Sequence, residues 1–218
     1  MAPRILAVLG PKGGVGKSTI ASNLLVAALL DGVAAAGLDL DSQGSLMTWG
    51  QDRSRRGRQP SATVVAATVG DWRAAVAHER SRALVVVDCP PSLEDERRLV
   101  EVLALARAAT LVLVPTLPHG ASLRKVVDFS VVLRDRVGAP VVFVLNGVLP
   151  NRTLVNSSRE LLARRGELAP AEVPHRDAIT RALDNGGSVV ESPGTPGGGA
   201  VLSLWRFAQQ RLGLAEAA

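Results

Sequence analysis

The chain has 218 residues with 25 basic and 20 acidic side chains, which gives a formal net charge of +5. This length suits one domain with a buried core, and 47% hydrophobic with 21% charged residues excludes a largely disordered chain. A single cysteine excludes an internal disulfide and an all-cysteine metal site within one chain, and three Trp and three Phe without tyrosine leave little for nucleic-acid binding by base stacking.

Apolar runs alternate with helix-like segments along most of the chain. The predicted buried strands are Arg4–Leu9, Val33–Leu38, Val64–Ala67, Ala83–Val87, Thr110–Val114 and Val141–Leu145. The predicted helices are Lys17–Leu30, Asp71–Arg80, Glu94–Ala108, Leu123–Arg136, Thr153–Arg165, Ala178–Leu183 and Ala200–Leu212. This order predicts an α/β fold, a single domain over residues 1–218 with a mostly parallel, twisted sheet and helices on both faces. In such sheets ligands bind at the carboxyl ends of the strands.

A glycine-rich loop joins the first predicted strand to the first predicted helix. It reads Gly-Pro-Lys-Gly-Gly-Val-Gly-Lys-Ser-Thr over residues 10–19. Glycines let the backbone wrap an anion with N–H groups pointing inward, and the helix N-terminus adds unpaired donors and the positive end of its dipole. Lys17 is placed to reach the outer phosphates of a nucleotide, and the Ser18 hydroxyl to bind Mg²⁺. The nucleotide-binding residues expected here are Gly13, Gly14, Val15, Gly16, Lys17, Ser18 and Thr19.

Polar side chains follow three of the predicted strands. At Asp88 a carboxylate would hold Mg²⁺ through water, and burying it without a cation would be costly. Asp41 can orient a water molecule for attack on a γ-phosphate, with Asp39 as a supporting residue. For Asn146 two roles stay open, pairing with an adenine edge or capping a turn.

The loop departs from the usual phosphate-loop pattern. Pro11 stands where a glycine is usual, and an extra lysine, Lys12, precedes two glycines. This stretch resembles xKGGxxK[ST], the deviant Walker A signature of the ParA/MinD family of P-loop ATPases. Other segments resemble motifs of the same family, namely Asp39–Ser45, Val85–Pro91, Asn146 with Asn151–Thr153, and Val173–Arg176 with Gly187–Val189.

The resemblance implies a P-loop NTPase fold with ATP and Mg²⁺ as cofactors. It implies that Lys12 crosses a dimer interface to the phosphates of the partner subunit, so that ATP joins two subunits face to face. A cation supplied in this way stabilises developing charge much as an arginine finger does. The resemblance also ties Asp41 to hydrolysis and makes Asn146, Pro174 and Arg176 nucleotide-binding residues.

Within the family the chain is most similar to the small ParA-like partition and positioning ATPases. Because the phosphate loop begins at residue 10, no N-terminal DNA-reading domain is expected. This resemblance implies a cytoplasmic, nucleoid-associated homodimer that binds double-stranded DNA through sequence-independent phosphate contacts. A ParB-like or adaptor protein would stimulate hydrolysis, release the dimer and so segregate or position a cargo. The candidate DNA contacts are Arg152, Arg176, Arg181 and Arg206.

Most of the net charge lies in residues 49–82, which hold seven basic and three acidic residues. The excess gathers around Arg53, Arg55, Arg56 and Arg58. Two interpretations remain open, a solvated arginine-rich loop and a contact with a polyanion.

Two other functions compete with the ParA-like one. A MinD-like membrane-associated ATPase would use an amphipathic last helix, although the pattern of Ala200–Leu212 favours a helix packed on the fold. A metabolic ATP-dependent ligase or synthetase could use a related phosphate loop. Since no apolar segment is long enough for a signal peptide or a membrane span, no membrane contact is expected. The sequence does not name the cargo or the partner protein.

Overall fold

The computed structural model describes residues 2–91, 95–118, 120–150, 152–192 and 194–214, without the side chains of Ala121 and Arg152. Its strands are β1 Arg4–Val8, β2 Ala35–Asp39, β3 Thr63–Ala66, β4 Leu84–Asp88, β5 Leu111–Thr116, β6 Val141–Val148, β7 Glu167–Leu168 and β8 Val173–Pro174. They form one sheet in the order β3-β2-β4-β1-β5-β6-β7, with β8 beside β6, and every described pair is parallel.

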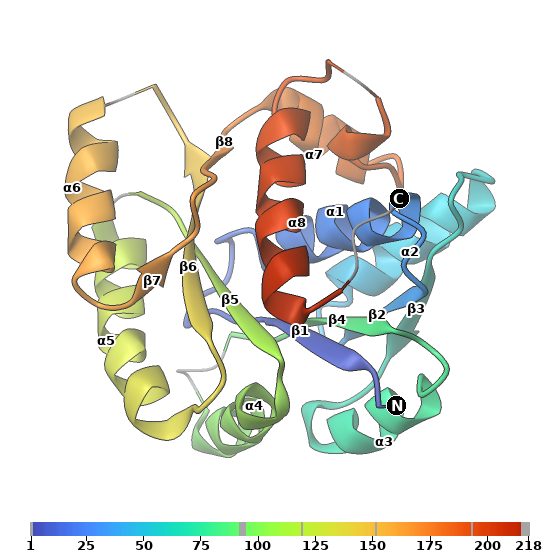
Figure 1. The fold of residues 1–218 in the computed structure, drawn as a ribbon, viewed down its shortest axis with the longest axis horizontal. Coiled ribbons are helices and arrows are strands. Elements are labelled where there is room, and N and C mark those ends of the chain that lie inside the picture. Colours follow the sequence, from blue (N-terminus) through green and yellow to red (C-terminus); the bar gives the residue numbers. More distant parts are fainter. Residues whose placement is uncertain (1, 92–94, 119, 151, 193, 215–218) are drawn as a thin grey trace.

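Helices cover both faces of this sheet (Figure 1). They are α1 Lys17–Leu30, α2 Ser45–Arg55, α3 Trp72–His78, α4 Glu96–Ala108, α5 Gly120–Arg136, α6 Arg152–Ala163, α7 Asp177–Leu183 and α8 Gly198–Leu212. The side chains of α1, α2, α7 and α8 join one hydrophobic core, and those of α3, α4, α5 and α6 join the other. The predicted α/β fold with a parallel sheet between two helical layers is confirmed.

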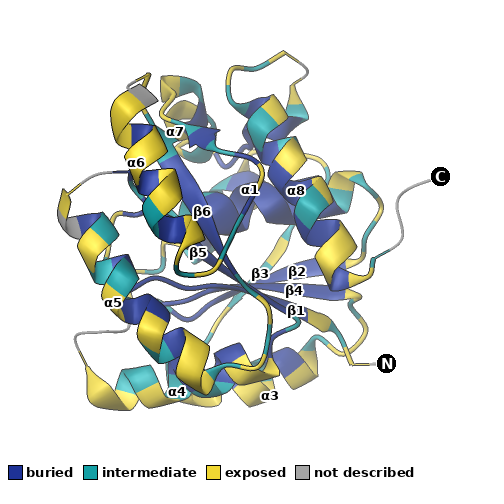
Figure 2. Cartoon of the chain, turned by 60° about the vertical axis from the view of Figure 1, so that its left-hand side comes forward, coloured by how far each residue is buried: buried dark blue, intermediate teal, exposed yellow. Residues whose placement is uncertain are grey.

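Both faces of the central strands are apolar, so the sheet itself is buried (Figure 2). On β1, Leu6 and Val8 point into the first core, while Ile5 and Ala7 point into the second. Helix α1 is also buried nearly all round, at ten of its 14 residues. A helix that is buried on most of its surface belongs at the centre of a layer, and the phosphate loop leads into the N-terminus of this helix.

All six predicted strands and all seven predicted helices are present, with ends that shift by up to three residues. Glu94, the predicted first residue of one helix, lies outside the described residues. The sequence did not predict α2 or the two-residue strands β7 and β8.

Helix α2 was missed because its buried face does not look hydrophobic. The buried residues Leu46, Trp49, Gly50 and Arg53 have helical spacing, but a glycine and an arginine hide the pattern. The glycine is required, because a Cβ at Gly50 would lie 2.7 Å from Cγ2 of Val64 on β3. The helix therefore packs directly on the edge of the sheet.

The prediction of a solvated arginine-rich loop or a polyanion contact is wrong for Arg53. This residue lies within α2 with only 1% of its side chain exposed. Its guanidinium donates to the carbonyl oxygens of Pro60 (2.9 and 2.7 Å) and Gly186 (3.1 Å) and to Oε1 of Glu191 (2.8 Å). Its charge is therefore used within the fold.

Two of the neighbouring arginines also form ion pairs, although Glu191 is shared between Arg53 and Arg58. Arg55 pairs with Asp52, and Arg58 lies 3.8 Å from Oε2 of Glu191. Arg56 is exposed and forms no ion pair with a described residue. Arg53 thus belongs to the packing of α2, whereas Arg55 and Arg56 remain at the surface.

The last helix lies on the fold, as predicted. Its apolar face is buried, at Val201, Leu204, Trp205, Ala208 and Leu212. Nε1 of Trp205 donates to Oδ2 of Asp31 (2.6 Å), which fastens α8 to the end of α1. Across the described ranges, no helix combines the length and apolar character needed to cross a membrane.

Replacing Arg53 with alanine should lower the free energy of unfolding by about 3 kcal/mol, because Glu191 would lose its buried partner. Arg55→Ala is the matched control, since Arg55 lies two residues further along the same helix and is 71% exposed. Its cost should stay below about 0.5 kcal/mol. Urea unfolding of the two variants tests this, and equal losses would contradict the buried role of Arg53.

Candidate functional site

Residues 10–16 form a loop between β1 and α1 whose shape depends on glycine. Gly14 and Gly16 have φ angles of +73° and +91°, which side-chain-bearing residues rarely adopt. A Cβ at Gly16 would lie 2.1 Å from Nδ2 of Asn146. That same nitrogen donates to the carbonyl oxygen of Val15 (2.8 Å). Asn146, near the carboxyl end of β6, therefore fastens the loop to the sheet.

The N-terminus of α1 offers an anion site. No side chain caps it, and its first turn carries no acidic residue, so its backbone N–H groups remain available. Lys17 is 6% exposed, and its Nζ donates to the carbonyl oxygen of Lys12 (3.4 Å). A cation and free backbone donors thus meet at the same turn.

Three carboxylates gather at the ends of β2 and β4. Asp39 and Asp88 are direct neighbours in the sheet register, and both are buried. Asp39 accepts hydrogen bonds from the backbone N–H groups of Asp41 (3.0 Å) and Met47 (2.8 Å), so it shapes the turn that leads into α2. Asp41 is partly exposed, and its Oδ1 accepts from the N–H of Gln43 (3.1 Å).

Asp88 is the least satisfied polar group of the site. Its side chain is fully buried, and neither oxygen has a hydrogen-bond partner among the described residues. Burial raises its pKa to about 7; the nearby Ser18 hydroxyl and Lys17 lower the pKa, and the negative charges of Asp39 and Asp41 raise it. Burial likewise raises the pKa of Asp39, although the N–H groups that it accepts counteract this.

An unpartnered buried carboxylate next to a serine hydroxyl fits a divalent cation. Within the described ranges no three His, Cys, Asp or Glu side chains are grouped to hold a metal by themselves. Mg²⁺ is commonly bound by one or two protein groups together with water and phosphate oxygens. Ser18 and Asp88 suit that kind of incomplete protein site.

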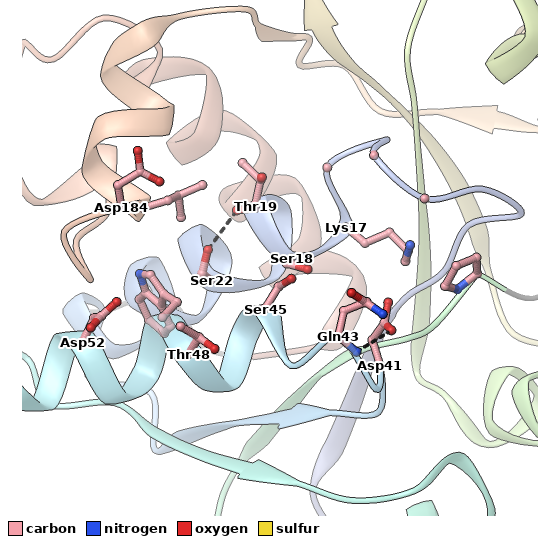
Figure 3. Close-up of a pocket in the computed structure, with 16 residues that line it drawn as sticks. Lys17, Ser18, Thr19, Ser22, Asp41, Gln43, Ser45, Thr48, Asp52 and Asp184 are labelled. Atoms are coloured by element: carbon pink, nitrogen blue, oxygen red, sulfur yellow. Dashed lines mark hydrogen bonds between the residues drawn. The ribbon is translucent and has the colours of Figure 1, made fainter.

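A pocket of about 720 Å³ opens beside the phosphate loop. Figure 3 shows Lys17, Asp41 and Gln43 at one end and Asp52 and Asp184 at the other. Its volume is within the range of small-molecule sites. The lining residues are Gly13, Gly14, Gly16, Lys17, Ser18, Thr19, Ser22, Asp41, Gln43, Ser45, Thr48, Trp49, Asp52, Pro91, Leu183 and Asp184.

The structure brings many of the predicted site residues to this pocket, but not all. The predicted residues that do not line it are Lys12, Val15, Asp39, Asp88, Asn146, Pro174 and Arg176. The amide nitrogen of Asn146 is used by the loop. Pro174 belongs to β8, and Arg176 is an exposed residue before α7 whose guanidinium donates to the carbonyl oxygen of His175.

The sequence missed the second wall of the pocket. Ser45, Thr48, Trp49 and Asp52 face it from α2 at spacings of three and four residues. That spacing is the signal that could have found them, but it has meaning only once the segment is known to be a helix.

The predicted DNA contacts belong to separate elements of the chain. Arg181 lies on α7 and Arg206 on α8, and both are exposed. Arg176 is exposed as well, and the side chain of Arg152 lies outside the described residues.

Comparison with known proteins agrees with this geometry. A family model described as the CobQ/CobB/MinD/ParA nucleotide binding domain matches residues 6–189. The maintenance of carboxysome distribution protein A of Gloeobacter kilaueensis is 34% identical over 127 residues, which is 58% of this chain. The match spans 55%, about half, of that relative's own length.

Solved structures share the fold. The septum site-determining protein MinD of Pyrococcus horikoshii, complexed with Mg-ADP, has a TM-score of 0.71 and 18% identity over 95% of this chain and 96% of its own. An ATP complex of McdA from Cyanothece has a TM-score of 0.73 and 13% identity over 100% of this chain and 99% of its own. At these identities the likeness establishes the MinD/ParA type of P-loop fold.

In the absence of metal, the chain should lose stability as the pH rises. The ordinary pKa of an aspartate is about 4, and the pKa of Asp88 in the folded chain is raised to about 7. Between these two pH values the folded chain binds more protons than the unfolded chain. The free energy of unfolding therefore falls as the pH rises from about 4 to about 7. Asp88→Asn, which stays neutral, should remove most of this fall, by about 4 kcal/mol at most. Urea unfolding in EDTA at about pH 5 and about pH 8 measures it. A wild-type fall that Asp88→Asn leaves unchanged would show that Asp88 is not its source.

Proposed function

This chain belongs to the CobQ/CobB/MinD/ParA family of nucleotide-binding proteins, and we propose that it is a ParA-like ATPase that forms an ATP-sandwich homodimer and binds DNA non-specifically. In this proposal the protein is cytoplasmic and associated with the nucleoid. A ParB-like or adaptor protein stimulates ATP hydrolysis and so releases the dimer from the nucleoid. The cycle would segregate or position a cargo. The name of the Gloeobacter relative suggests a protein assembly as one class of cargo, and a plasmid or chromosome element is the other.

The state of Lys12 carries the proposal. Lys17 is the first residue of α1, and its ammonium donates to the carbonyl oxygen of Lys12 in the loop of the same chain. The Lys12 side chain is half-buried, and its ammonium forms no ion pair or hydrogen bond with any residue that the structure describes. Lys17 is therefore hydrogen-bonded to the loop of its own chain, and Lys12 remains available for the phosphates of a partner subunit.

The remaining site residues fit ATP with Mg²⁺. Residues 13–19 would hold the phosphates, and Ser18 with Asp88, the latter through water, would hold the metal. The cation supplies charge neutralisation on the outer phosphates. Asp41, partly exposed on the pocket wall, would orient the attacking water, and Asp39 would hold Asp41 in place through its backbone N–H. Asn146, Pro174 and Arg176 remain the proposed residues around the base.

DNA binding would depend on dimerisation. The exposed arginines Arg176, Arg181 and Arg206, together with Arg152, are few in one chain, and a dimer doubles them. Two weak patches that are joined bind a polyanion much more tightly than one, so affinity would follow the nucleotide state.

The competing functions are supported less. For a MinD-like membrane switch, the apolar face of α8 would have to leave the core that it now closes. A metabolic ligase or synthetase is favoured by one observation, the extension of the pocket along α2 to Asp52 and Asp184. It predicts turnover that needs a small molecule and no protein partner.

The purified chain should bind random-sequence duplex DNA in the presence of Mg-ATP and not of Mg-ADP. Affinity should fall more than tenfold between about 50 and about 200 mM salt, because phosphate contacts release counterions. Fluorescence anisotropy with labelled DNA measures this. Lys12→Ala should bind ATP but remain monomeric in gel filtration and lose DNA binding. ATP-dependent binding to anionic vesicles with none to DNA would favour the membrane switch instead.

Asp41→Ala should keep ATP binding and the ATP-dependent dimer but slow hydrolysis by about 100-fold, since the attacking water loses its orienting group. Asp52→Ala is the matched control, because Asp52 is another carboxylate on the same pocket wall. Single-turnover phosphate release compares the two variants. An unchanged rate in Asp41→Ala would remove Asp41 from the mechanism.

A further inference from the structure

The pocket lies between two walls that no direct hydrogen bond joins. Thr19 and Ser22 of α1 form one wall, and Ser45 and Thr48 of α2 form the other (Figure 3). No hydrogen bond links the described residues of α1 and α2. Yet α2 begins four residues after Asp41, so its placement relative to α1 sets how far Asp41 lies from the phosphate loop.

Beyond its apolar packing and the bond from Met47 to Asp39, helix α2 is also fastened to the segment of residues 185–191. Nε1 of Trp49 donates to the carbonyl oxygen of Gly187 (2.9 Å), and Nη1 of Arg53 donates to that of Gly186 (3.1 Å). Gly186 has a φ of +62°, and a Cβ there would lie 2.3 Å from the backbone nitrogen of Arg53. The two backbones are therefore in direct contact, which only glycine allows.

Glu191 reinforces this contact from inside the same segment. Its Oε1 accepts from Nη2 of Arg53 (2.8 Å), and its Oε2 accepts from the N–H of Ser188 (2.6 Å). One carboxylate thus joins the side chain of α2 to the backbone of residue 188.

Ser188 continues the connection to α1. Its hydroxyl donates to Oδ1 of Asn23 (2.6 Å), and the N–H of Val189 donates to the same oxygen (3.2 Å). Nδ2 of Asn23 in turn donates to the carbonyl oxygen of Thr19 (2.8 Å), in the first turn of α1. Asn23 and Ser188 are 1% and 5% exposed, so water does not compete for these hydrogen bonds.

We propose that Arg53, Glu191, Ser188 and Asn23 form a positioning network that holds the α2 wall, and with it Asp41, at a fixed distance from the phosphate loop. None of the four lines the pocket, so they act on it through the Thr19 carbonyl and through α2. The inference rests on the proposed ATPase function. It explains why a buried arginine and a buried asparagine occur in the two helices that frame the pocket.

A network that positions Asp41 relative to the phosphate loop should affect the rate of ATP hydrolysis more than nucleotide binding. Geometric errors of about 1 Å at a reacting centre cost up to about 100-fold in rate, whereas phosphate binding depends on the loop itself. A purely structural network would instead lower stability and leave the turnover of the folded fraction unchanged.

Ser188→Ala is the mildest test, because the N–H of Val189 still serves Asn23 and the fold should persist. Ser158→Ala is its matched control, since Ser158 is 1% exposed, its hydroxyl donates to the carbonyl oxygen of Leu154 (2.8 Å), and it lies on α6 away from the pocket. The measurements are kcat for ATP hydrolysis, Kd for a non-hydrolysable ATP analogue, and hydrogen exchange of the α2 amides.

Ser188→Ala should lower kcat by about fivefold, keep Kd within about twofold, and speed exchange across α2. Ser158→Ala should change none of these. Unchanged α2 exchange in Ser188→Ala, an equal kcat loss in both variants, or a loss of affinity that matches the loss of kcat would each overturn the network. If the wild type does not hydrolyse ATP, the proposed function fails, and the exchange of α2 still decides whether the network holds that wall.

Discussion

A buried carboxylate without a partner is the constraint around which the site is organised. Asp88 ends a strand that is covered on both faces, where an ionised group costs several kcal/mol unless a cation meets it. The groups that reduce this cost, the Ser18 hydroxyl and the Lys17 ammonium, both come from the first turn of α1. The carboxylate and the phosphate loop are therefore a single electrostatic unit, which a metal–nucleotide complex would complete.

Sequence patterns could predict the parts of the fold that depend on a single local pattern of residues. The strands are continuous apolar runs, and the phosphate loop is a stretch whose glycines and lysines have defined chemical roles. Thus Lys17, Ser18 and Asp41 were predicted for the pocket and line it. Asp88 was predicted to need a cation, and it is the carboxylate that burial leaves unsatisfied.

Tertiary contacts over a long sequence separation were beyond prediction. Buried Arg53 donates a hydrogen bond to the carbonyl oxygen of Gly186, which is 133 residues away in the sequence. No local sequence pattern predicts that contact. With α2 unrecognised, its polar stripe could not be placed on the pocket wall. For the same reason the arginine-rich segment was judged by its charge, although Arg53 is buried and paired with Glu191 inside the structure. The net charge of a segment thus does not show which of its arginines reach the surface.

The position of α8 bears on how the chain folds during synthesis. The residues of α1 are synthesised early, yet part of the apolar surface of this helix is covered by α8. Asp31, at the end of α1, also accepts a hydrogen bond from Trp205 of α8. That surface stays uncovered until some 180 further residues have been made, at a rate of about 5–20 residues per second. The nascent chain therefore carries this apolar segment without its final cover for roughly ten seconds or more, and chaperones bind such surfaces. A chain that stops before α8 would keep its phosphate-loop sequence but leave the helix behind that loop without its cover.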